Sequence, residues 1–161
     1  MNWEQLANEL DCPNQGGDDL AKASIIRLLG DEFIFEAVDK AIVISDQGSE
    51  LARSVLILLR SKTAMDYTLK IYRNSDDIEQ KRSAVNLLKA ISNQTILEFV
   101  PEFLAHEDEG IQNWGAAILD QLAFSGMVDK SDCDDALSIM ESHSNPQVRW
   151  HREEAMKEFA R

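Results

Sequence analysis

Cysteine and histidine, the residue types that most often do chemistry in proteins, are few in this chain and widely separated. Cys12 and Cys133 stand far apart, and His106, His143 and His151 share no short spacing with them. Zinc or redox chemistry would require a CxxC pair or a Cys/His cluster, and neither pattern occurs in the sequence. We therefore predict ordinary reduced thiols, histidines that pack or lie at the surface, and no bound metal ion.

Other motifs of catalysis and nucleotide binding are also missing from the sequence. No GxGxxG or GxxxxGK loop could cradle phosphates, and no HExxH or GxSxG marks a metalloprotease helix or a serine nucleophile. The acidic run at 132–135 lacks the glycine and the distal glutamate of a calcium loop, so we interpret it as an acidic helix start. The sequence therefore predicts a protein that is not an enzyme and needs no cofactor.

The excess of acidic over basic residues limits the kinds of molecule that the chain is expected to bind. The chain has 161 residues, with 16 Lys and Arg against 29 Asp and Glu, and a net charge of −13. This charge disfavours nucleic acid and anionic membrane surfaces as ligands, and it suits a partner that carries positive charge. The first residues show no signal peptide, and no apolar run reaches the ~18 residues of a membrane span. We expect a cytoplasmic protein without a membrane segment.

A repeat runs along the chain and predicts the elements that position these residues. Ten-residue segments that begin at 20, 51 and 80 align without gaps, and segments at 111 and 148 keep part of the pattern. Each has apolar residues among its places 1, 5, 6 and 9, the periodicity of an amphipathic helix. Second helical patterns lie at Phe33–Ile44, Ala64–Tyr72, Thr95–Leu104 and Cys133–Glu141, and Asn2–Leu10 precedes the first repeat.

The sequence thus predicts an all-α protein with one domain over residues 1–161. Its architecture is expected to be an α-solenoid of about five helix-turn-helix repeats, or about ten helices. Asn145 before Pro146 is typical of a helix start, and Pro101 should bend or break the helix that contains it. The expected core residues of the repeated helices are Leu20, Leu28, Leu51, Val55, Leu59, Ala84, Leu88, Ile111, Leu119 and Val148.

The repeated helix resembles the second helix of HEAT repeats, where an apolar residue is followed by a basic residue, a small pair and then leucine. This resemblance is carried by Val148-Arg149, Lys81-Arg82, Ala116-Ala117 and Leu28-Leu29-Gly30. The spacing of about 31 residues is shorter than the ~40–47 of most HEAT and armadillo units. It is similar to that of the short HEAT-like repeats in bilin-lyase-type proteins. The resemblance implies that the repeated helices line a concave surface.

Charge is divided between the two sets of helices. The repeated helices, taken as 20–29, 51–62, 80–91, 111–123 and 148–161, contain 12 basic and 4 acidic residues, whereas the remainder contains 4 and 25. With places 1, 5, 6 and 9 buried, places 3, 7 and 10 should form an exposed stripe. The predicted concave stripe, with the tryptophans beside it, comprises Lys22, Arg53, Ile57, Arg60, Arg82, Asn86, Lys89, Trp114 and Trp150.

An acidic rim is the alternative binding surface. Its residues lie in the turns before the repeated helices and are Asp76, Asp77, Glu107, Asp108 and Glu109. Ion pairs between neighbouring repeats and helix capping would explain part of this charge pattern without any ligand. The two tryptophans could equally fill gaps between helices. Both interpretations stay open at the level of the sequence.

The sequence favours a non-catalytic module that binds another protein through its curved surface. Its acidity and small size are typical of a cytoplasmic immunity or inhibitor protein that neutralises a basic toxin or an enzyme. The alternative is a HEAT-like nucleic-acid binder or DNA glycosylase, for which Trp114, Trp150 and Asp120 would be the residues of interest. A small-molecule lyase or chaperone of the bilin-lyase type is a further alternative.

Overall fold

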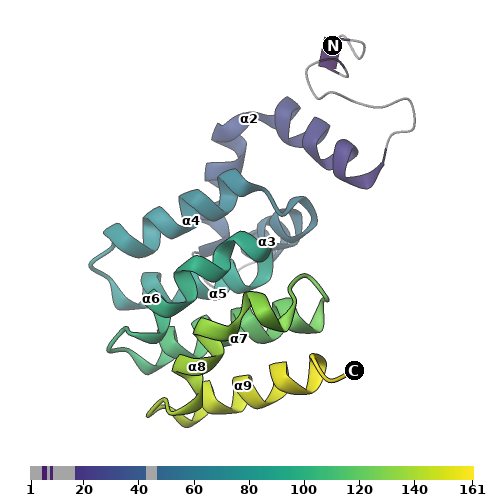
Figure 1. The fold of residues 1–161 in the computed structure, drawn as a ribbon. Coiled ribbons are helices and arrows are strands. Elements are labelled where there is room, and N and C mark those ends of the chain that lie inside the picture. Colours follow the sequence, from purple (N-terminus) through teal and green to yellow (C-terminus); the bar gives the residue numbers. More distant parts are fainter. Residues whose placement is uncertain (1–4, 7, 9–16, 43–46) are drawn as a thin grey trace.

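The structure is a computed structural model, and it describes residues 5, 6, 8, 17–42 and 47–161. Every regular element within these residues is a helix, which confirms the predicted all-α class (Figure 1). None of the described helices is long and apolar enough to cross a membrane. The α-helices are α2 (Asp18–Ile42), α3 (Gln47–Leu59), α4 (Lys62–Asn74), α5 (Ile78–Ile91), α6 (Val100–Leu104), α7 (Glu109–Phe124), α8 (Asp134–Glu141) and α9 (Pro146–Glu158), and the 3₁₀ helices are η1 (Gln94–Phe99) and η2 (Lys130–Asp132).

The helices that carry the repeated segments pack against one another in chain order. α3 contacts α5, α5 contacts α7, and α7 contacts α9. The intervening helices pack beside them: α4 on α5, α6 on α7 and α8 on α9. In Figure 1 the elements follow one another from the N-terminal to the C-terminal end of the molecule. Each helix therefore buries its apolar face against helices that are close in the sequence.

The described residues contain eight α-helices rather than about ten, and the first repeat accounts for the difference. Most of the predicted helix Asn2–Leu10 lies outside the described residues. The helices predicted at 20–29 and Phe33–Ile44 form one element, α2, with a kink at Gly30 (φ 77°, ψ 168°). Glycine adopts this conformation without a steric penalty, so Gly30 bends the helix where the sequence pattern predicted its end.

Helix starts and breaks follow the predicted signals. The Asn145 side chain accepts a hydrogen bond from the Gln147 amide (2.9 Å), and Pro146 occupies the first turn of α9. Pro101 lies in the first turn of the short α6, and the residues before it form the 3₁₀ helix η1 instead of a continuous α-helix. Since proline has no amide donor for the preceding turn, one long helix over 95–104 is excluded.

The predicted core is correct in the middle and C-terminal parts of the chain and wrong at its N-terminal end. Leu28 and Leu51 are 44% and 66% exposed. Leu28 lies in the first half of α2, which projects from the rest of the molecule and therefore lacks a neighbouring helix on one side (Figure 1). Of the other predicted core residues, Leu20 and Val55 are half-buried, and the buried ones are Leu59, Ala84, Leu88, Ile111, Leu119 and Val148.

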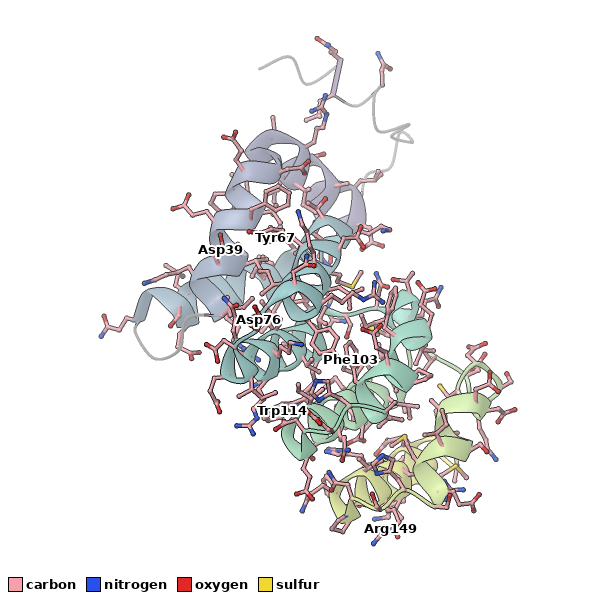
Figure 2. The ribbon with its side chains drawn as sticks, turned by 90° about the vertical axis from the view of Figure 1, so that its left-hand side faces the viewer. Asp39, Tyr67, Asp76, Phe103, Trp114 and Arg149 are labelled. Carbon is pink, nitrogen blue, oxygen red and sulfur yellow. The ribbon has the colours of Figure 1, made fainter. Side chains whose placement is uncertain are left out.

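One close approach fixes α6 relative to α7. Phe103 of α6, labelled in Figure 2, is fully buried. Its ring meets that of Tyr72 in α4 edge-on, with centroids 5.0 Å apart. A methyl carbon placed on Gly115 of α7 would lie only 2.5 Å from the Phe103 Cβ. The two backbones can approach this closely because residue 115 has no side chain.

Candidate functional site

Arg53, in the predicted concave stripe, links α3 to α5. Its guanidinium donates hydrogen bonds to the backbone oxygen of Asn86 (3.1 Å) and to that residue's side-chain Oδ1 (2.8 Å). Burial lowers the pKa of Arg53, and the nearby Glu50 carboxylate opposes this shift. Both stripe residues are thus engaged with each other, and Arg53 acts as a strut between successive repeated helices.

Arg82 forms a second strut, and it joins the concave stripe to the acidic rim. Its Nε and Nη2 atoms donate to the two carboxylate oxygens of Asp108 at 2.9 and 2.6 Å, and Nη1 pairs with Glu79. Asp108 also caps α7, since it accepts a hydrogen bond from the Ile111 amide (3.0 Å). The hydrogen bond from Arg82 is the main cause that lowers the pKa of Asp108 to about 2, and the same contact raises the pKa of Arg82.

Two basic stripe residues from different repeats line one depression. Lys22 and Arg60 border a concavity of about 580 Å³ that Leu59 and Met127 also line. The Lys22 ammonium lies 4.0 Å from Asp19, and the Arg60 guanidinium reaches the Met127 sulfur at 3.1 Å. A neutral sulfur is a weak acceptor, so Arg60 keeps most of its hydrogen-bonding capacity. The stripe residue Ile57 is exposed on α3.

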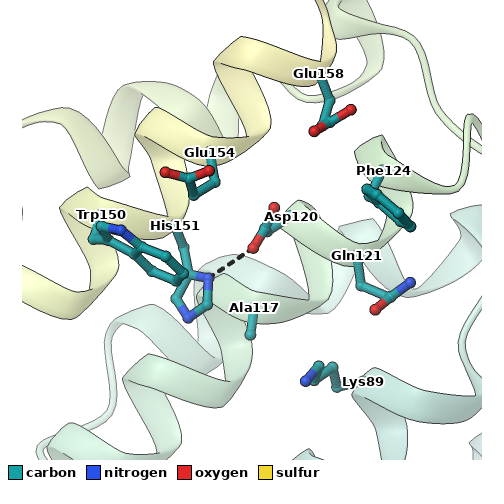
Figure 3. Close-up of a pocket in the computed structure, with 9 residues that line it drawn as sticks. All are labelled: Lys89, Ala117, Asp120, Gln121, Phe124, Trp150, His151, Glu154 and Glu158. Carbon is teal, nitrogen blue, oxygen red and sulfur yellow. Dashed lines mark hydrogen bonds and ion pairs between the residues drawn. The ribbon is translucent and has the colours of Figure 1, made fainter.

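The C-terminal part of the stripe forms a pocket between α5, α7 and α9 (Figure 3). Its volume is about 310 Å³. Lys89, Ala117, Asp120, Trp150 and Glu154, all at stripe positions of three successive repeats, line it together. The remaining lining residues, which were not among the predicted site residues, are Gln121, Phe124, His151 and Glu158.

Three of these four residues could have been found from helical spacing alone. In α7, Gln121 follows Ala117 and Phe124 follows Asp120 by four positions, and in α9 Glu158 follows Glu154 by four. Residues four apart lie on the same helical face, so taking the next turn after each stripe residue would have included all three. His151 directly follows Trp150, outside the periodicity of the stripe, and only the packing of α9 on α7 brings it to the pocket.

Exposed aromatic rings and carboxylates characterise the pocket. The side chains of Trp150 and Phe124 remain 49% and 67% exposed. The imidazole of His151 meets the Trp150 ring edge-on at 4.7 Å, and its Nδ1 lies 3.0 Å from the Asp120 carboxylate. Three carboxylates face one ammonium group, that of Lys89, among the lining residues. The pocket therefore combines apolar surface with an excess of negative charge.

The second predicted tryptophan lies beside this pocket and is half-buried against the core. The Trp114 ring holds the Lys89 ammonium 5.3 Å from its centroid, a cation–π contact between α7 and α5. Trp114 thus packs against the core and holds Lys89 at the edge of the pocket, whereas about half of Trp150 is exposed.

Helix capping occupies part of the acidic rim. Asp77 accepts a hydrogen bond from the Glu79 amide (2.9 Å) at the start of α5, and Asp108 caps α7. Asp76, Glu107 and Glu109 are exposed. These three are therefore the rim carboxylates that do not serve as caps.

The described cysteine is not poised for thiolate chemistry. Cys133 is buried, and burial together with Asp132 and Asp134 raises the pKa of its thiol to about 11, so the reactive thiolate is scarce at neutral pH. Within the described ranges, no three His, Cys, Asp or Glu side chains are grouped as a metal site would require.

Comparison with protein-family models, with curated proteins and with solved structures found no match to this chain.

Proposed function

We propose that this chain is a non-catalytic protein-binding module, built as a short HEAT-like α-solenoid in a single domain. The order of packing supports this architecture, because α3, α5, α7 and α9 each contact the next member of the set. In such an array one helical face from each repeat contributes to a continuous concave surface.

The observation that carries the proposal is the pocket on this surface, with Trp150 and Phe124 exposed at its edge. The free energy of large aromatic side chains falls when they are removed from water, and these side chains are enriched where proteins bind each other. A central aromatic pair surrounded by charged groups has the composition of a binding hot spot. Trp150, Phe124 and the adjacent carboxylates therefore form the proposed centre of the interface.

In its most concrete form, the module is a cytoplasmic immunity or inhibitor protein that neutralises a toxin or an enzyme. The net charge of −13 would accelerate encounter with a basic partner. A nucleic-acid ligand on the basic stripe would need available guanidinium groups, and those of Arg53 and Arg82 already bond within the chain. These internal bonds favour the protein-binding alternative.

Comparative capture tests the proposal. The full chain and its Trp150→Ser/Phe124→Ser variant are immobilised and exposed to extract of the source cells, and the bound proteins are compared by mass spectrometry. Leu58→Ser is a matched control, because Leu58 is 64% exposed on α3, far from the pocket in the chain. We expect a protein that the parent and the control retain and the double variant loses. Identical bound proteins for all three chains would refute the pocket as the binding centre.

A further inference from the structure

We propose that the pocket between α5, α7 and α9 receives the guanidinium group of an arginine side chain presented by the protein partner. This inference rests on the proposed function, since it names the chemical group that the same pocket would recognise. It follows from three features of the lining residues: their carboxylates, their exposed aromatic rings and the shape that contains both.

The carboxylates come from two different helices and have only weak competitors. Asp120 lies on α7, and Glu154 and Glu158 lie on α9. Glu154 pairs with Lys157 (2.6 Å) and Glu158 with Arg161 (2.7 Å), each within one turn of the chain. Such pairs at a surface contribute on the order of 0–1 kcal/mol, so an incoming cation can share both carboxylates. Asp120 keeps His151 as its partner and adds negative charge at the base of the pocket.

The aromatic rings offer the second half of a cation site. Trp150 and Phe124 flank the pocket in Figure 3. Neither ring takes part in any of the three cation–π contacts found in the described part of the chain, which involve Phe99, Tyr72 and Trp114. The Lys89–Trp114 contact shows that an ammonium group already lies against an indole ring next to the pocket. A second cation over Trp150 would repeat this arrangement one repeat further along.

A guanidinium group fits these features better than other polar groups. It is planar and stacks on aromatic rings, and its five donors can reach carboxylates on separate helices at once. Among the lining residues an anionic ligand would meet three carboxylates against one lysine, and the nearby cations Lys157 and Arg161 already pair with two of these carboxylates. The volume of about 310 Å³ lies at the lower end of the range for ligand pockets, which suits one side chain rather than a larger molecule.

The test uses the full chain, labelled with ¹⁵N, and short blocked peptides. The probe is acetyl-Gly-Gly-Arg-Gly-Gly-amide, and its counterpart carries citrulline, which has the shape of arginine without the charge. The Trp150 indole N–H resonance, assigned by its loss in Trp150→Phe, reports binding. We expect the arginine peptide to shift this resonance with a Kd on the order of 1 mM, and the citrulline peptide to leave it unchanged. No shift with arginine, or equal shifts with both peptides, would overturn the inference.

Paired charge variants locate the site. Glu154→Gln with Glu158→Gln should raise the Kd of the arginine peptide by about tenfold, because two charge-assisted contacts are weakened. Glu32→Gln with Glu153→Gln removes the same charge from exposed positions outside the pocket and should change the Kd little. Equal effects of the two pairs would mean that net charge alone attracts the peptide, which contradicts a defined site. Thermal melting of each variant verifies that the fold is retained.

The two proposals can fail separately. If capture of a partner depends on Trp150 and Phe124 but is unchanged by Glu154→Gln/Glu158→Gln, the arginine assignment is wrong and the protein-binding function stands. If the arginine peptide binds as expected but the Trp150→Ser/Phe124→Ser variant captures the same proteins as the parent, the arginine site stands and the proposed function fails.

Discussion

Replacement of Gly115 by alanine should destabilise the protein, although alanine favours helices. Gly115 lies inside α7, where alanine would normally stabilise by about 0.5–1 kcal/mol. Its new methyl carbon would lie 2.5 Å from the Cβ and 3.3 Å from the Cγ of Phe103, whereas ordinary contacts are 3.4–4 Å. Since a Cβ atom moves only with its backbone, α6 and α7 would have to separate.

The two effects have opposite signs, and overpacking is the larger. Extra methyl groups in a packed interior cost about 1–3 kcal/mol, and a Cβ–Cβ approach of 2.5 Å belongs to the upper part of that range, about 2–3 kcal/mol. Subtracting a helix gain of up to about 1 kcal/mol leaves a net loss of about 1–2 kcal/mol. For a chain of this size that corresponds to a fall in Tm of roughly 2–8 °C. The loss should be visible in both thermal and denaturant unfolding, with a lower midpoint at an unchanged slope.

The matched control is Gly17→Ala, where the new methyl group would have no atom within 4 Å. This variant should shift the Tm by much less, because only a capping position before α2 is altered. A Gly115→Ala protein as stable as the parent, or more stable, would refute the argument that residue 115 must lack a side chain to admit Phe103.

Three further predictions concern the core and the struts. Leu59→Ala should cost about 2–5 kcal/mol in denaturant unfolding, because Leu59 is buried in the core cluster and truncation leaves a cavity. Asp108→Asn keeps a good cap but removes the charge, so the free energy of unfolding at pH 7 should fall. Because the pKa of Asp108 is about 2 when folded and 3.8 ordinarily, the difference in stability between parent and variant should shrink in denaturant unfolding as the pH drops from about 4 to about 2. Arg53→Glu with Arg82→Glu should lower the Tm well below that of an exposed charge reversal, Lys70→Glu, and equal melting would mean that the arginines are not struts.

Apolar periodicity predicts α3, α4, α5, α7, α8 and α9 well because local burial decides them. Each has neighbours on both sides or along its apolar face, and the period of its apolar residues matches that packing. The first repeat is different, since Gly30 can either end a helix or bend it. A glycine after an apolar helical pattern looks the same in the sequence whether the helix ends there or bends there. Which of the two occurs depends on tertiary contacts that the apolar pattern does not show. Leu28, at place 9 of the first repeat, was assigned to the core because the pattern assumes such contacts.

The sequence predicts which residues share one surface, but not that some of them enclose a pocket. Places 3, 7 and 10 of the repeat correctly bring Lys89, Asp120 and Trp150 to one surface, because helical spacing is a local property. Which charges remain available on that surface depends on partners one repeat away. Arg53, for example, donates to the backbone oxygen of Asn86, 33 residues further along the chain. Every residue type has a backbone oxygen, so the sequence cannot indicate which one Arg53 contacts.

The same repeat position has two different roles along the molecule. Place 3 is Arg53 and Arg82 in the second and third repeats, and each of these arginines reaches the following repeat. In the fourth and fifth repeats this place is taken by Asn113 and Trp150. The arginine struts therefore end where the pocket begins, and the exposed ring of Trp150 occupies a position that a strut fills elsewhere. Because α9 packs mainly on α7 and α8, a change of residue at this place can open a binding site without disturbing α3 or α4.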